Sequence, residues 1–424
     1  MERRDEKGEA RKREGKFRKE MSEKGLNILV TGAGGFVGKN LCAALENIRD
    51  GKDRTRGPLE IAEIYRYDLD TGQALLEDYC RKADFVFNLA GVNRPKNPEE
   101  FMQGNFGFAS TLLDTLKKEG NRCPIMISSS IQATLEGRFE GSSYGISKKA
   151  GEELMFDYGK KSGAKVLVYR FSNLFGKWCR PNYNSVVATF CNNIANDLPI
   201  QINDPETILD LIYIDDLVDE MTEALKGREH RCEFAGVNPI PTPEGRYCYV
   251  PVSHRVSLGE IAALLRKFHD QSQTLEVPAT KPGSFEKKLY ATYLSYLPEA
   301  KASYPLLSHT DQRGSFTELF HFPEGGQISV NISKPGITKG QHWHDTKVEA
   351  FVVIKGHGLI EQRKIGTEEI RRYEVSGDKP EAVLTLPGYA HNLINLSDTE
   401  DMVTLIWCSE VFAPSKPDTF SEKV

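Results

Sequence analysis

The segment 27–38 constrains the fold of this chain more than any other, because a short apolar run passes there directly into a glycine-rich turn. Its first five residues predict a fully buried strand of a parallel sheet. The glycines that follow have G-x-x-G-x-x-G spacing, and residues 38–48 predict a helix. Such glycines let a strand turn sharply into a helix while a pyrophosphate lies against the helix's first N–H groups. The residues that we expect at this cofactor site are Gly32, Gly35, Phe36, Val37 and Gly38.

The composition indicates a globular protein with more than one domain. The chain has 424 residues, of which 39% are hydrophobic and 27% are charged, and its formal net charge is −5. A chain of this length divides into two or three domains. Its mild negative charge argues against nucleic acid or an anionic membrane as the main partner. Residues 1–20 are densely charged and nearly free of large apolar side chains, which predicts a disordered leader.

Neither targeting signals nor cysteine pairs are evident in the sequence. No segment has the apolar core of a signal peptide or the length of a transmembrane helix. The eight cysteines are scattered and show no C-x-x-C pairing, which is typical of reduced thiols. We therefore expect a cytoplasmic protein without membrane insertion.

The second strand of the domain is expected to carry the residue that discriminates between NAD and NADP. Residues 59–67 predict this strand, and Arg66 lies near its end. An arginine there pairs with the 2′-phosphate of NADP, whereas an acidic residue accepts hydrogen bonds from the ribose of NAD. Arg66 therefore favours NADPH. Asp68 and Asp70 follow closely, and a solvated surface charge is the alternative role for Arg66.

Further strands end in small or hydroxylated residues and are followed by a tyrosine–lysine pair. Residues 84–89 predict a buried strand that ends in Leu89, Ala90 and Gly91, where the backbone can approach the cofactor. On a helix, Tyr144 and Lys148 share one face. An ammonium group there is expected to lower the phenol's pKa and to bind the cofactor ribose, so that the tyrosine donates a proton to a carbonyl that accepts hydride.

These motifs together resemble the extended short-chain dehydrogenases/reductases over residues 26 to about 295. The resemblance implies a Rossmann-like, doubly wound parallel α/β sheet and makes Ser130 the serine of the catalytic triad, with Ser129 as the register alternative. In the nucleotide-sugar members, the loops after the later strands contact the substrate. Arginine and lysine suit a diphosphate there, and asparagine suits a uracil or a sugar hydroxyl. The candidates are Arg94, Asn173, Lys177, Arg180 and Asn184.

The composition changes after Pro298, where helical patterns give way to short strands separated by glycine turns. Regularly spaced short strands predict a small β-barrel or jelly roll. We therefore expect a reductase domain over residues 21–298 and a second, all-β domain over residues 299–424.

The second domain contains a pattern typical of metal ligands. His342 and His344 alternate along a predicted strand, Glu349 is expected to return on the neighbouring strand, and His391 follows a Pro-Gly turn. Three imidazoles and one carboxylate suit a divalent transition metal such as Zn²⁺, with positions left open for substrate. A structural zinc ion, or histidines without a metal, are the alternatives. The pattern resembles the cupin motifs.

Both halves resemble the CapF/WbjC family of bifunctional capsular polysaccharide synthesis enzymes. The resemblance rests on the segments 128–134, 175–179, 293–298, 311–316 and 333–340 and covers about residues 26–424. It implies C3 epimerisation of a UDP-2-acetamido-2,6-dideoxy-4-hexulose in the cupin domain, followed by reduction of the C4 ketone with NADPH in the first domain. It also implies a homodimer. The alternatives are a reductase whose cupin domain only dimerises, and a single-site UDP-sugar epimerase that uses NAD.

Overall fold

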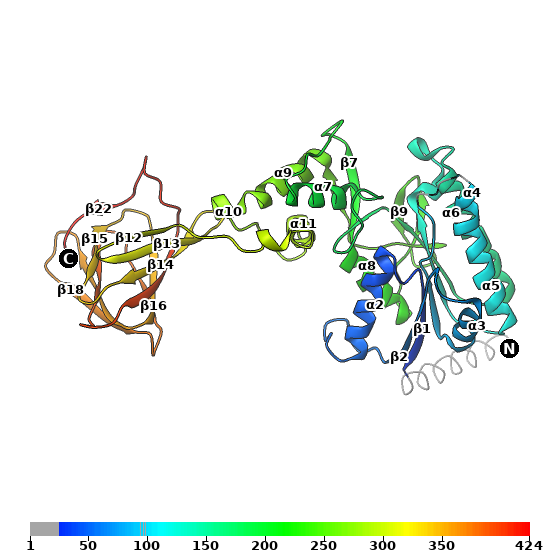
Figure 1. Cartoon of the computed structure of the whole chain (residues 1–424), viewed down its shortest axis with the longest axis horizontal. Helices are drawn as coiled ribbons and strands as arrows, with labels where there is room; N and C mark the ends of the chain where they lie inside the picture. The colour runs from blue at the N-terminus through cyan, green and yellow to red at the C-terminus, as the bar shows by residue number, and fades with distance from the viewer. Residues whose placement is uncertain (1–24, 94, 96, 98) are drawn as a thin grey trace, which may run out of the picture. The chain divides into compact units, whose positions relative to one another are not determined.

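The computed structural model describes residues 25–424 except 94, 96 and 98. The predicted leader and the candidate Arg94 therefore lie outside the described residues. The chain forms two compact units (Figure 1). The first comprises the chain up to Ala263 together with Ala291–Tyr296, and the second comprises Leu264–Tyr290 and Leu297–Val424. These units are not the functional domains, whose expected boundary after residue 298 stays a prediction.

The first unit is built on a mainly parallel sheet with the strand order β2-β1-β3-β4-β5-β10-β8-β9. Its first five strands in this order run parallel, and β1 is hydrogen-bonded between β2 and β3. The chain therefore changes direction across the sheet between β1 and β3, which is where open α/β sheets bind their ligands. The strands are β1 (Leu26–Thr31), β2 (Ile61–Tyr67), β3 (Phe85–Asn88), β4 (Ile125–Ser130), β5 (Val166–Phe171), β8 (Arg231–Ala235), β9 (Asn238–Pro241) and β10 (Tyr247–Cys248).

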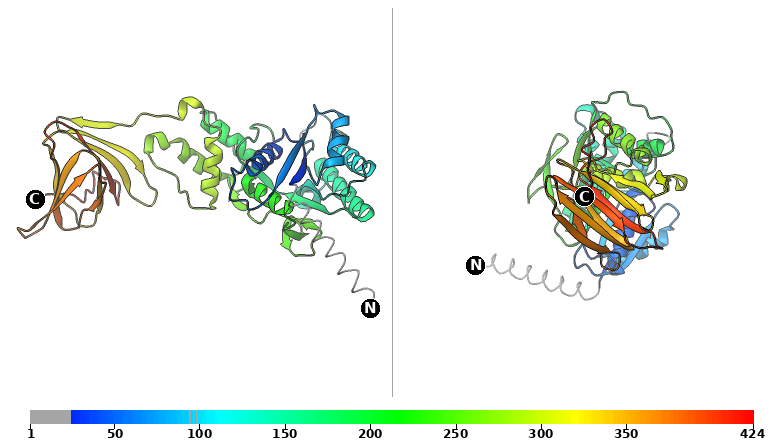
Figure 2. Two further views of the ribbon diagram at one scale, coloured as in Figure 1. Left: turned by 90° about the horizontal axis from the view of Figure 1, so that it is seen from below. Right: turned by 90° about the vertical axis from the view of Figure 1, so that its left-hand side faces the viewer.

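Helices cover both faces of this sheet (Figures 1 and 2). One apolar cluster joins the sheet to α2 and α8, and a second joins it to α3, α5 and α6. Burial on both faces explains why the strands read as continuous apolar runs in the sequence. These helices are α2 (Phe36–Arg49), α3 (Gln73–Lys82), α5 (Phe108–Lys118), α6 (Ser143–Ser162) and α8 (Ile214–Leu225).

The first unit also contains a smaller sheet, and several short helices lie in this unit or at the start of the second. The sheet has the order β11-β7-β6, and α5 is preceded by a π-helical turn. The strands are β6 (Asn173–Phe175), β7 (Ile208–Tyr213) and β11 (His254–Ser257). The helices are α4 (Glu99–Phe101), the π-turn Met102–Gly107, the 3₁₀ turns Ile131–Thr134, Gly137–Phe139 and Glu299–Lys301, α7 (Val186–Ala195), α9 (Leu258–His269), α10 (Gln271–Thr274) and α11 (Phe285–Leu294).

The second unit contains two antiparallel sheets with the orders β12-β13-β14-β21-β16-β19 and β18-β17-β20-β15-β22. Figure 2 shows their strands in yellow, orange and red. Both fold predictions, the Rossmann-like sheet and the all-β cupin, are confirmed. The strands are β12 (Ser308–Asp311), β13 (Gly314–His321), β14 (Gln327–Ser333), β15 (Thr338–Trp343), β16 (Glu349–Lys355), β17 (His357–Lys364), β18 (Ile370–Ser376), β19 (Ala382–Leu384), β20 (Tyr389–Asn395), β21 (Met402–Cys408) and β22 (Phe420–Ser421).

One detail of the predicted strand pairing is wrong. Glu349 lies on β16, in the sheet that faces β15, and not on a strand next to the one that carries His342. The neighbour of β15 is β20, where His391 pairs directly with His342. The strands from β14 to β17 thus alternate between the two sheets, and a local pattern does not encode that alternation. Among the described residues, no helix combines the length and the apolar character needed to cross a bilayer.

Candidate functional site

The glycine-rich turn after β1 forms a close-packed cradle beside the end of β3. Gly32 has φ +67°, and a Cβ atom at this position would lie 2.7 Å from the backbone nitrogen of Ala90. A Cβ at Gly38 would lie 2.2 Å from the carbonyl oxygen of Gly32. The Thr31 hydroxyl donates to Asn88 Oδ1 (2.8 Å), which ties the two strand ends together. Only glycine fits these approaches, and the free N–H groups at the start of α2 fit a dinucleotide pyrophosphate.

The end of β2 offers both an acidic and a basic group to a nucleotide ribose. The backbone N–H of Gly34 donates to Asp68 Oδ2 (2.6 Å), so this carboxylate borders the glycine turn. The guanidinium of Arg66 forms an ion pair with Glu46 on α2 and is half exposed. Arg66 is thus held near the turn but is not committed to the protein core.

The predicted tyrosine–lysine pair lies at the carboxyl ends of β3 and β4. Lys148 is buried, and its ammonium donates to the carbonyl oxygen of Ser128 (3.0 Å) and lies 5.7 Å from the centre of the Tyr144 ring. A Cβ at Gly91 would lie 3.1 Å from Lys148 Nζ. Gly145 has a similar role, because a Cβ there would lie 2.3 Å from the carbonyl oxygen of Gln132. Glycines therefore bring the strand ends and α6 together.

Burial controls the protonation of this pair. It raises the pKa of Tyr144 to about 12, so the expectation that Lys148 lowers the phenol's pKa is not met. Burial also lowers the pKa of Lys148 to about 8, while the nearby Glu152 carboxylate acts in the opposite direction. At neutral pH the tyrosine keeps its proton and the lysine keeps its charge.

The structure distinguishes the two candidate serines. The Ser129 hydroxyl is buried and donates to Glu152 (2.5 Å), which also binds Arg170 through two hydrogen bonds of 2.8 and 2.6 Å. Ser130 is half-buried at the end of β4, and its oxygen accepts a hydrogen bond from the backbone N–H of Gln132 (3.2 Å). Its hydroxyl proton is therefore available to a ligand, and the geometry favours Ser130 over Ser129.

The other substrate candidates lie on β6 and on the loop that leads to α7. Asn173 donates to the carbonyl oxygen of Asp210 (3.4 Å), and Lys177 pairs with Asp215 (2.8 Å). Arg180 and Asn184 are exposed, and the Arg180 guanidinium lies over the Tyr183 ring at 5.3 Å. These contacts do not join the four side chains to the tyrosine–lysine pair, so their role stays a prediction.

Sequence reasoning missed one buried residue of this region, Asn105. It lies in the π-helical turn before α5, where its amide oxygen accepts from the backbone N–H of Val92 (3.0 Å) and its NH₂ group donates to Ser147 (3.0 Å). A Cβ at Gly91 would lie 2.7 Å from the same amide oxygen. The available signal was a polar residue within a largely apolar segment. The π-helical turn that directs its side chain towards Val92 and Ser147 has no sequence signature.

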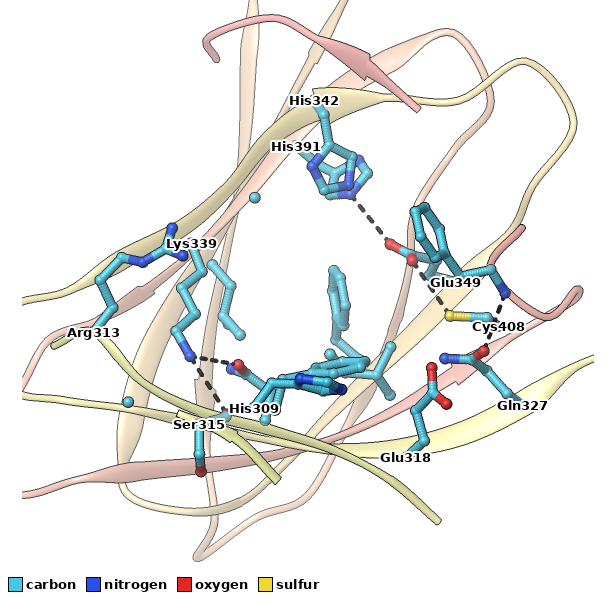
Figure 3. A pocket seen from close by; sticks show the side chains of 18 of the residues that line it. His309, Arg313, Ser315, Glu318, Gln327, Lys339, His342, Glu349, His391 and Cys408 are labelled. Carbon is cyan, nitrogen blue, oxygen red and sulfur yellow. Dashed lines mark hydrogen bonds and ion pairs between the residues drawn. The ribbon is translucent and has the colours of Figure 1, made fainter. Parts of the chain in front are cut away.

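In the second unit, His342, His344, Glu349 and His391 come together. One nitrogen or oxygen atom from each lies within 4.8 Å of all the others. The His342 and His391 rings are 4.6 Å apart on the paired strands β15 and β20, and Glu349 reaches them from the facing sheet. Figure 3 shows Glu349 pointing towards the two rings across the cavity. A bulge at Gln341, with φ +66°, separates Gly340 from His342 in the register of β15.

The donor atoms of this cluster fit a metal ion. His344 and His391 are buried, and among the described residues their Nε2 atoms have no hydrogen-bond partner. They lie 3.5 and 3.3 Å from Glu349 Oε2. Burial and the neighbouring His391 lower the pKa of His342 to about 4. Burial alone would raise the pKa of Glu349, but the adjacent imidazoles and Lys347 lower it below its ordinary value. Neutral imidazoles and an ionised carboxylate are the ligand forms that zinc requires.

The cluster opens onto a cavity of about 670 Å³ whose walls combine polar and apolar side chains. Lys339 lies on another wall, where its ammonium donates to Asn331 Oδ1 and to the carbonyl oxygen of Ile332, both at 2.8 Å. Figure 3 shows this side chain pointing away from the histidines, towards Ser315. A cavity of this size accommodates a sugar ring with room for further groups.

Comparison with known proteins relates both units to proteins of polysaccharide biosynthesis. Residues 28–232 match the NAD dependent epimerase/dehydratase family, and residues 309–420 match the polysaccharide biosynthesis C-terminal domain. A Pseudomonas aeruginosa protein described as UDP-2-acetamido-2,6-beta-L-arabino-hexul-4-ose reductase is 38% identical over 396 residues. The match covers 93% of this chain and 98% of that protein.

Solved structures agree with this relationship. The crystal structure of the capsular polysaccharide assembling protein CapF from Staphylococcus aureus is 46% identical, with a TM-score of 0.82, and the match covers 94% of this chain and 100% of that chain. A structure of CapF with the inhibitor 3-isopropenyl-tropolone is 43% identical with a TM-score of 0.77, at the same coverage. The chain therefore belongs to the CapF family, in which an NAD dependent epimerase/dehydratase domain precedes a polysaccharide biosynthesis C-terminal domain.

Proposed function

We propose that this chain is a bifunctional enzyme that epimerises a UDP-2-acetamido-2,6-dideoxy-4-hexulose at C3 and then reduces its C4 ketone with NADPH. The product is UDP-2-acetamido-2,6-dideoxy-L-talose, a precursor of N-acetyl-L-fucosamine in a surface polysaccharide. The observation that carries this proposal is the presence of two separate constellations, the Tyr144–Lys148 pair and the histidine–glutamate cluster, on one chain. The name of the Pseudomonas relative supports the 4-ketosugar as substrate of the reduction.

In the reductase site, bound NADPH supplies a hydride to C4 of the ketosugar. The Tyr144 hydroxyl, protonated at neutral pH because burial raises its pKa to about 12, donates its proton to the ketone oxygen as the alkoxide forms. The Ser130 hydroxyl donates a hydrogen bond to the same oxygen. The Lys148 ammonium stabilises the negative charge that develops on the tyrosine oxygen.

The preference for NADPH rests on Arg66. Its guanidinium suits a 2′-phosphate, and its exposed partner Glu46 releases it at little cost because surface ion pairs contribute little stability. Asp68 opposes this preference, since its carboxylate borders the glycine turn at 2.6 Å from the Gly34 nitrogen. We propose that, when a 2′-phosphate is present, its attraction to Arg66 contributes more to the free energy of cofactor binding than its repulsion from Asp68.

In the epimerase site, His342, His344, Glu349 and His391 hold a divalent metal ion, most simply Zn²⁺. A bound metal supplies Lewis acidity to the ketone oxygen of the sugar. The C4 ketone acidifies the C3 proton, so epimerisation has to precede reduction, which removes that ketone. The cavity beside the cluster has room for the sugar ring.

Incubation with the 4-keto-6-deoxy UDP-sugar in deuterated water tests this function. Without NADPH, we expect deuterium at C3 and no net consumption of ketone. With NADPH, we expect one NADPH oxidised for each ketone reduced and deuterium at C3 of the product. A product without C3 deuterium would contradict the epimerase assignment, whereas tightly retained NAD and no net NADPH oxidation would favour the single-site epimerase.

We also propose that the second unit forms a homodimer, because the outer face of one of its sheets is apolar. One row across this sheet pairs Phe320, Ile328, Trp407, Ala350 and Leu384 in register, and three of these side chains are exposed by 42–54%. The inner face of β14 carries polar residues instead. Exposed apolar side chains that gather on one face of a sheet indicate a partner surface there.

Light scattering tests the homodimer. A Trp407→Glu substitution places a charge in the middle of the apolar row, and we expect it to shift the protein from dimer to monomer. Glu374→Lys, an exposed charge change on β18 in the other sheet, serves as the control. A wild-type protein that is monomeric at micromolar concentration would contradict the homodimer without affecting the two proposed activities.

A further inference from the structure

The segment that follows β21 returns to the strand that carries the first metal-ligand candidate. Its strand β22 pairs antiparallel with β15, which places Ser421 opposite His342 and Phe420 opposite Trp343. The Phe420 and Trp343 rings lie 4.7 Å apart. The backbone N–H of Glu422 donates to the carbonyl oxygen of Gln341 (3.0 Å). This segment is therefore fixed along the edge of the sheet at the metal-ligand cluster.

Asp418 lies just before β22 and organises the loop between two of the proposed ligands. Its Oδ1 accepts from the backbone N–H of Asp345 (2.8 Å), and its Oδ2 accepts from the backbone N–H groups of Thr346 and Lys347 (both 2.8 Å). Oδ2 also accepts from the Thr346 hydroxyl (3.0 Å). These three consecutive residues lie between His344 and Glu349, so one carboxylate determines the path of the whole connection.

The main chain of Asp418 also determines which ring nitrogen of His344 faces the cluster. Nδ1 of His344 is hydrogen-bonded to the Asp418 carbonyl oxygen. A carbonyl oxygen only accepts hydrogen bonds, so Nδ1 carries the proton and the lone pair of the neutral ring is on Nε2. That Nε2 atom is buried and lies 3.5 Å from Glu349 Oε2. The ring is thus presented with its free nitrogen towards the other three donors.

We propose that Asp418 is a positioning residue for the metal site, because it fixes the 345–347 loop with its carboxylate and the tautomer of His344 with its carbonyl. Outer hydrogen bonds of this kind orient ligands and strengthen metal binding. The inference rests on the proposed metal function of the histidine–glutamate cluster. It adds a residue that lies 74 positions from His344 in the chain and that belongs to no recognisable ligand motif.

The test compares Asp418→Ala and Asp418→Asn with the matched control Asp398→Ala, which changes an exposed aspartate in the turn before β21. Zinc affinity is measured on metal-free full-length protein by competition with a chromogenic chelator. We expect a roughly 10- to 100-fold weaker affinity for Asp418→Ala, a smaller loss for Asp418→Asn, which keeps one acceptor, and no change for Asp398→Ala. Thermal unfolding of the metal-free proteins shows whether each variant is folded.

A second measurement does not require metal. In ¹⁵N-histidine-labelled, metal-free protein, the NMR shifts of His344, assigned with a His344→Gln sample, report the position of its ring proton. We expect the proton on Nδ1 in the wild type. Asp418→Ala keeps the main-chain carbonyl but loses the carboxylate that holds it against the 345–347 loop, so we expect a mixture of tautomers in this variant. Unchanged zinc affinity in Asp418→Ala would overturn the role of Asp418 alone. A wild-type protein that binds no zinc would overturn the proposed metal function itself.

Discussion

At the scale of single residues, the candidates of the reductase site differ in the hydrogen-bond partners that they already have. Ser129 is engaged with Glu152, which leaves Ser130 for a ligand. Tyr144 keeps its proton because burial raises its pKa, and Lys148 keeps its position through the Ser128 carbonyl. A residue's type thus makes it a candidate, but its partners decide whether it is available for chemistry.

Replacing Tyr144 with phenylalanine is expected to reduce NADPH oxidation by at least about 10²-fold, which is typical for the loss of a general acid. The ring contact with Phe101, at 5.6 Å, is retained in this variant. Deuterium exchange at C3 should continue at the wild-type rate, because the histidine–glutamate cluster belongs to the other unit. The two rates are measured by absorbance at 340 nm and by mass spectrometry. Loss of deuterium exchange at C3 in this variant would contradict the assignment of two separate sites.

Replacing Arg66 with alanine is expected to weaken NADPH binding by at least about tenfold while changing NADH binding little. The reason is that the guanidinium is expected to contact only the 2′-phosphate, which NADH lacks. The ratio of the two KM values provides the measurement. The matched control is Arg49→Ala, which removes an exposed arginine of α2 paired with Asp50. Equal losses for both cofactors would mean that Arg66 is structural or that Asp68 sets the preference.

At the scale of secondary-structure elements, α6 carries the candidate residues of the proposed reductase site on one face. Tyr144, Lys148 and Glu152 follow one another at intervals of four residues and therefore align along this helix. Glu152 is fully buried and joins α6 to β4 through Ser129 and to β5 through Arg170. The Glu152 carboxylate thus holds α6, β4 and β5 in fixed positions relative to one another.

This arrangement predicts how activity depends on pH. Burial lowers the pKa of Lys148 to about 8, so kcat for reduction should fall as the pH rises above about 8 and the ammonium is lost. The Glu152 carboxylate counteracts burial, so Glu152→Gln should move this fall to lower pH. In Lys148→Arg the side chain stays charged at high pH, so the residual activity of this variant should not fall above pH 8. A pH profile that is the same in Glu152→Gln and wild type would contradict a role of Glu152 in setting the charge of Lys148.

The same pKa shift has a consequence for stability. Between pH 8 and 10.5, Lys148 binds a proton in the unfolded chain but not in the folded one, so this residue makes the free energy of unfolding increase with pH in that range. Below pH about 8 both states are charged, and the cost of burying the ammonium is present in full. Lys148→Met should therefore stabilise the first unit most at pH 7 and least at pH 10.5, as measured by urea unfolding.

At the scale of the whole molecule, each constellation is complete within its own unit. The tyrosine–lysine pair uses β3, β4 and α6, and the histidine–glutamate cluster uses β15, β16 and β20. In the second unit, the buried residues of β14 are polar, while the outer face of its sheet is apolar. The second unit therefore combines a buried polar site with an outer surface suited to a partner.

A His342→Ala substitution tests this independence. It removes one metal ligand, so we expect loss of bound zinc, by elemental analysis, and loss of C3 exchange. Reduction of a ketosugar that is already epimerised should continue within about twofold of the wild type. If the metal is structural, the same substitution will lower the melting temperature of the second unit, and exchange will fall only in proportion to the unfolded fraction. Wild-type protein purified without chelators and found free of metal would contradict both roles.

The sequence by itself determined the two domain types, the glycine turn, the tyrosine–lysine pair and the four metal-ligand candidates. These features depend on local spacing, because helix and strand periods and turn residues are properties of short segments. Only the tertiary structure decided that Ser130 rather than Ser129 is available and that Glu349 faces the histidines from the opposite sheet. It also decided that Asn105 is hydrogen-bonded to Ser147 and that Asp418 is hydrogen-bonded to His344. Each of these depends on contacts between segments far apart in the chain, and local patterns do not encode which distant partner a side chain meets.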